Sequence, residues 1–141
     1  MSDPYSTGDV LDYPYLWDWQ YQRGETEGRK DRPCCVTLVV PLKNGQTRLY
    51  LLPITTTEPM QDEPSLEVPE IEAKRAGLDL GVRKWVMLSE WNADLLDQSF
   101  YLDRRQEKRG SFSKPFLDKI LTALRPLLAS RALSTVRRDE G

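Results

Sequence analysis

Arg32 and Thr55 are the two residues whose types and positions best suit chemistry on a phosphate group. Arg32 ends the charged segment 28–33 and precedes residues 34–40, an apolar run typical of a buried strand. Arginine binds a phosphate through two parallel hydrogen bonds and keeps its charge at neutral pH. A neighbouring threonine hydroxyl can donate to a phosphoryl oxygen as negative charge builds there. The pair therefore suggests a phosphate site.

A tight turn is predicted to bring these two residues together. Asn44-Gly45 separates the apolar run 34–40 from a second run, residues 47–52, and Asn-Gly is the strongest short hairpin signal. In an antiparallel hairpin the end of the second strand returns to the start of the first, so we expect Thr55 beside Arg32. Because such pairs are common at strand edges, the pair alone does not establish catalysis.

The elements that must hold this site are short strands and one helix. We expect strands over residues 8–13, 34–40, 47–52, 82–91 and 97–103, an exposed connection over 58–69, and a helical turn near 71–76. Ser113 is predicted to cap a helix with an apolar stripe, which Pro126 should kink or interrupt. This order predicts a mainly β fold, a small SH3-like antiparallel barrel with a C-terminal helix. We expect one domain over residues 8–133, a loose segment 1–7 and a frayed tail 134–141.

Residues 14–24 form an unusually aromatic segment, which we expect to be a loop. It begins with proline, ends with glycine and carries Tyr15, Trp17, Trp19 and Tyr21. Two interpretations stay open for these rings. They can fold back over one end of the barrel, or they can form a surface that stacks unpaired bases or binds a partner chain.

The composition limits the possible chemistry. The 141 residues include no histidine, so no mechanism of this chain uses an imidazole as acid, base or metal ligand. The two cysteines, Cys34 and Cys35, are adjacent, and neighbouring residues of a strand point to opposite faces. We therefore expect two small buried side chains, with neither a disulfide nor a zinc site, and no metal or cofactor.

Charge and hydropathy indicate the compartment of the protein and the partners it can bind. No apolar run approaches the roughly 20 residues that span a bilayer, and residues 1–5 have neither the basic flank nor the apolar core of a secretory signal. We expect a cytoplasmic protein without a membrane partner. The net charge is −2, and basic residues concentrate after residue 103, where they can face nucleic acid, an acidic partner or only solvent.

Three short motifs occur in an order that resembles one family. Gly8-Asp9-Val10 opens the first strand, residues 27–36 join a glutamate to Arg-Pro and an apolar strand, and residues 52–57 read Leu-Pro-Ile-Thr-Thr-Thr. In this order they resemble the MazF/PemK-like toxins of type II toxin–antitoxin systems, which are growth inhibitors with an SH3-like barrel. The aromatic loop and the acidic segment 58–72 depart from that pattern.

The resemblance implies a homodimeric, metal-independent endoribonuclease that cleaves single-stranded RNA and is silenced by an antitoxin protein. The 2′-hydroxyl of the RNA would be the nucleophile, giving a 2′,3′-cyclic phosphate and a 5′-hydroxyl. Arg32 and Thr55 then fall on catalytic positions, and Glu27 on the loop glutamate. Trp85, Trp91 and the final helix are the apolar candidates for the dimer interface. The residues we assign to RNA binding are Trp17, Trp19, Arg29, Lys30 and Thr56.

A second hypothesis belongs to another functional class. In it the chain is an SH3-like barrel that binds a protein or nucleic acid without catalysis. Arg32 would form a structural ion pair with Glu27, and the segment around Trp17 and Trp19 would be the binding surface.

Overall fold

A computed structural model describes residues 5–26, 28, 30–96, 101–102 and 106–138 of the chain. The fold is mainly β, with 34% of the described residues in strands and 22% in helices, and it resembles a small barrel. In chain order the elements are β1 (Asp9–Tyr13), α1 (Asp18–Gln22), β2 (Arg32–Pro41), β3 (Thr47–Thr55), β4 (Ser65–Glu67), α2 (Glu70–Arg75), β5 (Trp85–Met87), β6 (Glu90–Leu95), β7 (Gly110–Ser111), α3 (Lys114–Ala129) and β8 (Ser134–Arg137).

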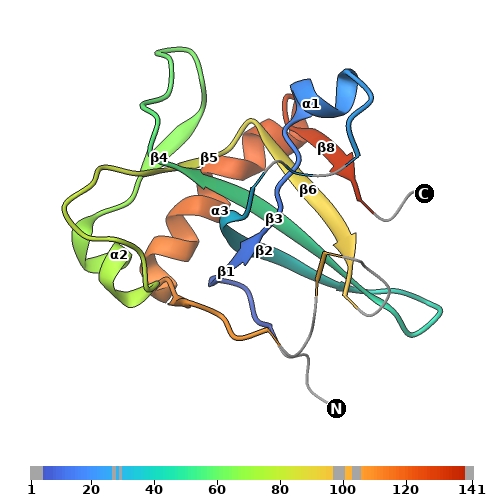
Figure 1. Cartoon of the computed structure of the whole chain (residues 1–141), viewed down its shortest axis with the longest axis horizontal. Coiled ribbons are helices and arrows are strands. Elements are labelled where there is room, and N and C mark those ends of the chain that lie inside the picture. Colours follow the sequence, from blue (N-terminus) through green and yellow to red (C-terminus); the bar gives the residue numbers. More distant parts are fainter. Residues whose placement is uncertain (1–4, 27, 29, 97–100, 103–105, 139–141) are drawn as a thin grey trace.

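The described strands form one hydrogen-bonded sheet around the long β2–β3 hairpin (Figure 1). Its order is β4-β5-β3-β2-β1-β7, with β6 beside β3 and β8 beside β6. The strand pairs are antiparallel except β6 with β8, which is parallel. The predicted turn is confirmed: Gly45 takes a positive φ of 86°, which glycine adopts without steric cost.

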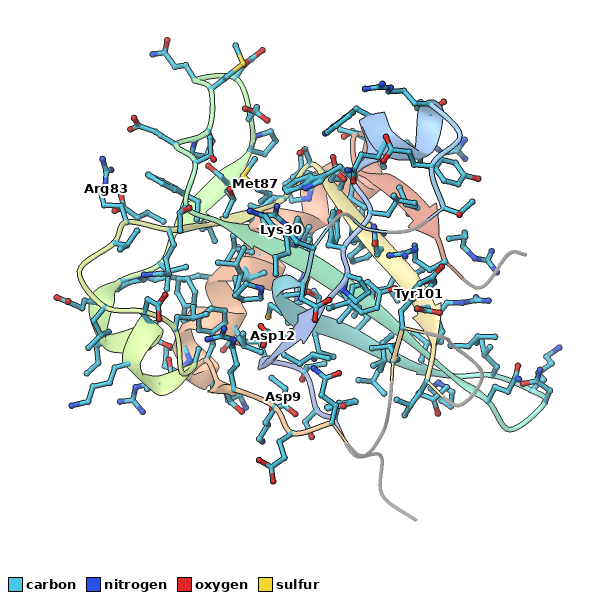
Figure 2. The ribbon with its side chains drawn as sticks, in the orientation of Figure 1. Asp9, Asp12, Lys30, Arg83, Met87 and Tyr101 are labelled. Carbon is cyan, nitrogen blue, oxygen red and sulfur yellow. The ribbon has the colours of Figure 1, made fainter. Side chains whose placement is uncertain are left out.

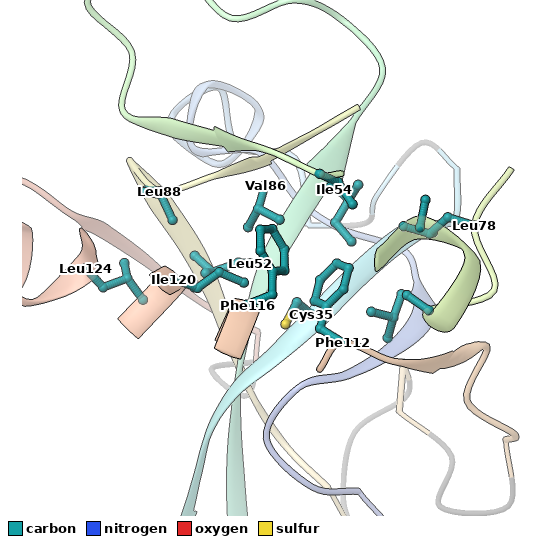
Figure 3. Close-up of a cluster of buried hydrophobic side chains, with 14 of the residues drawn as sticks. Cys35, Leu52, Ile54, Leu78, Val86, Leu88, Phe112, Phe116, Ile120 and Leu124 are labelled. Carbon is teal, nitrogen blue, oxygen red and sulfur yellow. The ribbon is translucent and has the colours of Figure 1, made fainter. Parts of the chain in front are cut away.

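Strand β3 changes partner along its length, which lets the sheet curve. Residues Arg48 to Leu51 pair with β6, whereas Ile54 and Thr55 pair with β5. Hydrophobic side chains are buried on both faces of the curved sheet, in two clusters. Cys34 lies in one cluster and Cys35 in the other, as the alternation of a strand predicts. Figure 3 shows the cluster of Cys35, where Phe116 and Ile120 of α3 lie beside Leu52 of β3.

The long helix α3 closes this cluster and begins where the sequence predicts. The Ser113 hydroxyl caps it by accepting the Phe116 N–H at 3.3 Å. Phe116, Ile120 and Leu124 form its buried face. Helix α3 continues through Pro126 to Ala129, so the expected interruption is wrong. Pro126 lies in the last turn, where the helix ends soon afterwards.

Several boundaries differ from the sequence-based expectations. The segment expected as one strand over 82–91 is divided into β5 and β6. The aromatic segment 14–24 contains the short helix α1, and the connection 58–69 contains β4. Part of the strand expected over 97–103 lies outside the described residues.

Both ends of the described chain are better anchored than expected. In place of a frayed end from residue 134 onward, Ser134 to Arg137 form β8 and Arg138 is buried. Tyr5, expected in a loose segment, is 3% exposed and its hydroxyl donates to the Gln106 carbonyl at 2.8 Å. Of the helices in the described residues, none has the length and apolar character that crossing a bilayer requires.

Candidate functional site

An open pocket of about 410 Å³ lies where β2 begins, β3 ends and β6 begins. Figure 1 shows α1 and the segment between β3 and β4 rising on this same side of the molecule. Lys30 and Met87, which both line the pocket, are labelled in Figure 2. The residues that line it are Trp17, Trp19, Lys30, Arg32, Thr55, Thr56, Thr57, Glu58, Pro59, Glu63, Met87, Ser89 and Glu90.

The β2–β3 register brings Arg32 and Thr55 to this pocket. Cys34 pairs with Pro53, and Arg32 and Thr55 each lie two residues beyond that pair at the same end of the hairpin. Continuing an antiparallel register by two residues sets the two side chains across from one another on one face of the sheet. The expectation that Arg32 and Thr55 share one concave surface is confirmed.

The Arg32 guanidinium is held by an aromatic ring. It lies 4.9 Å from the centre of the Trp17 ring, a cation–π contact. Trp17 is itself fixed by an edge contact with the buried Tyr15, with ring centres 5.0 Å apart. A cation–π contact is an electrostatic attraction to the ring and needs no hydrogen bond from the guanidinium. The contact therefore orients Arg32 without using the donors that a phosphate needs.

The Thr55 hydroxyl is oriented by its own backbone. It is a largely buried side chain, and its oxygen accepts the Thr57 N–H at 3.1 Å. A hydroxyl that accepts from one group still has its hydrogen to donate to another. Thr55 is thus placed at the wall of the pocket as a hydrogen-bond donor.

Glu90 is a carboxylate of the pocket that sequence reasoning missed. One of its oxygens, Oε1, accepts the Tyr15 hydroxyl at 3.0 Å and the Asp18 N–H at 2.9 Å. Burial raises the pKa of Glu90 above its usual range, the two hydrogen bonds oppose that rise, and the charges of Asp18 and Glu63 add to it. A carboxyl group with a raised pKa in a pocket is a candidate for proton transfer.

The pocket carries both signs of charge. Lys30 and Arg32 lie in it together with three carboxyl groups, those of Glu58, Glu63 and Glu90. Glu58 is paired at 3.6 Å with Arg83, and both of these side chains are exposed. An anionic ligand in this pocket would therefore be attracted by Lys30 and Arg32 and repelled by the carboxylates.

Arg138 fastens the aromatic segment on which Trp17 and Trp19 lie. Its guanidinium donates to the Pro14 carbonyl at 2.7 Å, to the Thr26 carbonyl at 3.3 Å and to Asn92 Oδ1 at 3.1 Å. Both ends of the segment are therefore attached to one buried cation. The Asn92 side chain also exchanges two hydrogen bonds with the Leu16 backbone, at 2.8 and 2.9 Å.

Six of the eight predicted site residues meet in this pocket. They are Trp17, Trp19, Lys30, Arg32, Thr55 and Thr56. The other two, Glu27 and Arg29, lie outside the described residues. The alternative ion pair between Arg32 and Glu27 therefore stays a prediction. Among the described residues no ion pair involves Arg32.

The rings of the aromatic segment are divided between the core and the surface. Tyr15 is buried at 1% exposure and packs in the core, whereas Trp19 is 48% exposed and lines the pocket.

Trp85 and Trp91, which we expected at a dimer interface, are 7% and 4% exposed within the chain itself. That expectation is wrong, because both rings already belong to the fold.

Comparisons with known proteins leave the site to be interpreted from its own chemistry. No protein-family model matches the chain, and no curated protein matches its sequence. Within the described residues, no group of three or more cysteine, aspartate or glutamate side chains is placed to hold a metal ion.

Proposed function

We propose that this chain is an endoribonuclease that cleaves single-stranded RNA through attack of the RNA's own 2′-hydroxyl. One observation carries the proposal: Arg32, Thr55 and Glu90 line the same open pocket. They are the anion-binding cation, the hydroxyl donor and the titratable carboxyl that such a reaction needs without a histidine.

Each residue has a distinct role in the proposed reaction. Arg32 binds the scissile phosphate and stabilises the negative charge that builds on its oxygens, and Thr55 donates a hydrogen bond to one of them. Glu90 accepts the proton of the 2′-hydroxyl through Oε2, the oxygen not used by Tyr15 and Asp18. The 2′-oxygen then bonds to phosphorus while the bond to the 5′-oxygen breaks, and the departing 5′-oxygen takes a proton from water, to which the pocket is open. The products are a 2′,3′-cyclic phosphate and a 5′-hydroxyl end.

The direct test is incubation of the purified protein with mixed RNA in EDTA, followed by mapping of the cleaved ends. The proposal expects 5′-hydroxyl ends that a polynucleotide kinase can label without prior phosphatase treatment. Ends that carry a 5′-phosphate would require a different nucleophile and would overturn it.

We also propose that the chain is the toxin of a type II toxin–antitoxin pair and acts as a homodimer. Support comes from the ordered motifs at residues 8–10, 27–36 and 52–57. Exposed apolar side chains are available for an interface, among them Ile71, Leu80 and Val82. Sedimentation at micromolar concentration should give a dimer. A monomer would contradict the dimer and weaken the toxin assignment.

The runner-up function is a non-catalytic binding module. The carboxylates of Glu58 and Glu63 favour it, because they oppose the approach of an RNA backbone to part of the pocket. Such a module would bind RNA or a protein and leave RNA intact in the assay above.

A further inference from the structure

A second pocket adjoins the first on the side of the aromatic segment. Its volume is about 320 Å³, and its lining residues are Tyr15, Trp17, Trp19, Gln20, Lys30 and Arg32. Trp17, Trp19, Lys30 and Arg32 also line the first pocket. The two pockets are therefore neighbouring compartments that share these side chains.

The walls of the second pocket are largely aromatic. Tyr15 and Trp17 are in edge contact, and Arg32 covers the Trp17 ring, so Trp17 already has neighbours that fix it. Trp19 is 48% exposed, with the Arg23 guanidinium 5.6 Å from its ring centre. Flat unpaired bases stack on such rings whatever their sequence. Trp19 is thus the ring best placed to contact a base.

The polar groups of this pocket are donors. Gln20 is 2% exposed, and its side-chain carbonyl accepts the Trp17 N–H at 3.0 Å, which assigns the other end of the amide as the NH₂ group. Lys30 and Arg32 can only donate as well. The Tyr15 hydroxyl donates to Glu90, as described above. A base with a keto oxygen at position 4 of a pyrimidine or position 6 of a purine fits these donors, whereas the exocyclic amino group that cytosine and adenine carry at that position would face them as a second donor.

We propose that the second pocket binds one unpaired base of the RNA, next to the phosphate held in the first pocket, and that it prefers the keto bases uracil and guanine to cytosine and adenine. This inference rests on the proposed function, because it takes the ligand of the first pocket to be an RNA phosphate. Gln20 is the specificity-determining residue and Trp19 supplies the stacking surface.

Binding is measured with fluorescent 2′-O-methyl hexamers of uridine and of cytidine, which lack the attacking hydroxyl and are not cleaved. The wild type should bind the uridine hexamer several-fold more tightly. Trp19→Ala should weaken binding of both by about tenfold or more, the effect expected for loss of one stacking ring. Tyr21→Ala is the matched control, because Tyr21 is an exposed ring of α1 that lines neither pocket and should leave binding unchanged.

Gln20→Glu tests the selectivity. It keeps an oxygen for the Trp17 N–H and replaces the NH₂ donor with an acceptor, so the preference for uridine should disappear or reverse in favour of cytidine. Thermal unfolding shows whether Gln20→Glu, at a buried position, still folds. If it does not, Trp19→Ala decides the test, because Trp19 is exposed and its replacement should leave the fold intact.

The outcomes separate this proposal from the proposed function. Equal binding of the two hexamers by the wild type, no binding of either, or full affinity in Trp19→Ala overturns the base pocket even if RNA is cleaved. A preference for uridine that depends on Trp19 and Gln20, in a protein that cleaves no RNA, supports the base pocket and overturns the nuclease.

Discussion

The Arg32 guanidinium lies 4.9 Å from the centre of the Trp17 ring, so the cation proposed to bind phosphate is held by the aromatic segment. This relationship joins two features that the sequence presents separately, a charged strand start and a tryptophan-rich segment. It makes Trp17 a positioning residue for Arg32.

Replacing Trp17 should therefore lower activity through Arg32. Trp17→Leu should reduce kcat/KM for RNA cleavage about 2- to 30-fold, the range of a cation–π contact, and Trp17→Phe should lose less because a ring remains. The measurement is a double-mutant cycle. In an Arg32→Ala background the Trp17→Leu change should have little further effect. Full additivity of the two changes would show that Trp17 acts independently of Arg32.

Glu90 should govern the pH dependence of cleavage. Because its pKa is raised and its ionised form is the proposed proton acceptor, activity should rise with pH through a limb that lies above 4.5, the ordinary value for glutamate. Glu90→Gln should remove this limb and lower kcat by about 10²–10⁴-fold. An unchanged pH profile in Glu90→Gln would end the role of Glu90 as base.

The same raised pKa has a consequence for stability. A carboxyl group that is harder to ionise in the folded than in the unfolded state favours folding below pH 4.5, and this contribution is lost as pH rises through the raised pKa. At neutral pH, Glu90→Gln should therefore melt at the same temperature as the wild type or higher, since glutamine can still accept from Tyr15 and Asp18. The measurement is the melting temperature of wild type and Glu90→Gln from below pH 4.5 to neutral pH.

Glu63 should oppose RNA binding and tune Glu90. Glu63→Gln removes a negative charge from the pocket, so KM for RNA should fall about 2- to 5-fold at low salt, with a smaller effect at high salt because ions screen the charge. The acid limb should also move to lower pH, because the charge of Glu63 raises the pKa of Glu90. Asp62→Asn is the matched control: Asp62 is exposed in the same segment but does not line the pocket. An equal response of both variants would indicate only a change in net charge.

The hairpin and the helix cap could be predicted because short-range chemistry determines them. Asn44-Gly45 favours a turn, which joins β2 to β3 and sets their register beside the turn. The register shifts by one residue between Val36 and Leu38, before the pocket end of the hairpin, and the turn does not encode that shift. Ser113 before an apolar stripe likewise marks the start of α3. In both cases the information lies within a few residues of the feature.

Glu90 and Arg138 could not be placed because their partners are distant in sequence. The break between β5 and β6, at Leu88-Ser89, carries neither glycine nor proline, so one strand was the natural expectation. The one sequence signal for Glu90 is its position as an acidic residue inside the apolar run 82–91. Strand β8 is polar in sequence and gains its stability from parallel pairing with β6 and from the contacts of Arg138. Only the tertiary fold brings these groups together.

The most direct test of the account is RNA cleavage in EDTA by wild type, Arg32→Ala, Arg32→Lys, Thr55→Ala and Thr55→Ser. Wild type should cleave and leave 5′-hydroxyl ends. Arg32→Ala and Thr55→Ala should each lose about 10²–10³ in rate, the usual cost of one preorganised donor. Arg32→Lys should recover little, because an ammonium group cannot form the planar two-bond contact, whereas Thr55→Ser should retain more activity. Melting temperatures should stay close to that of the wild type. Full cleavage by a well-folded Arg32→Ala would contradict the catalytic assignment.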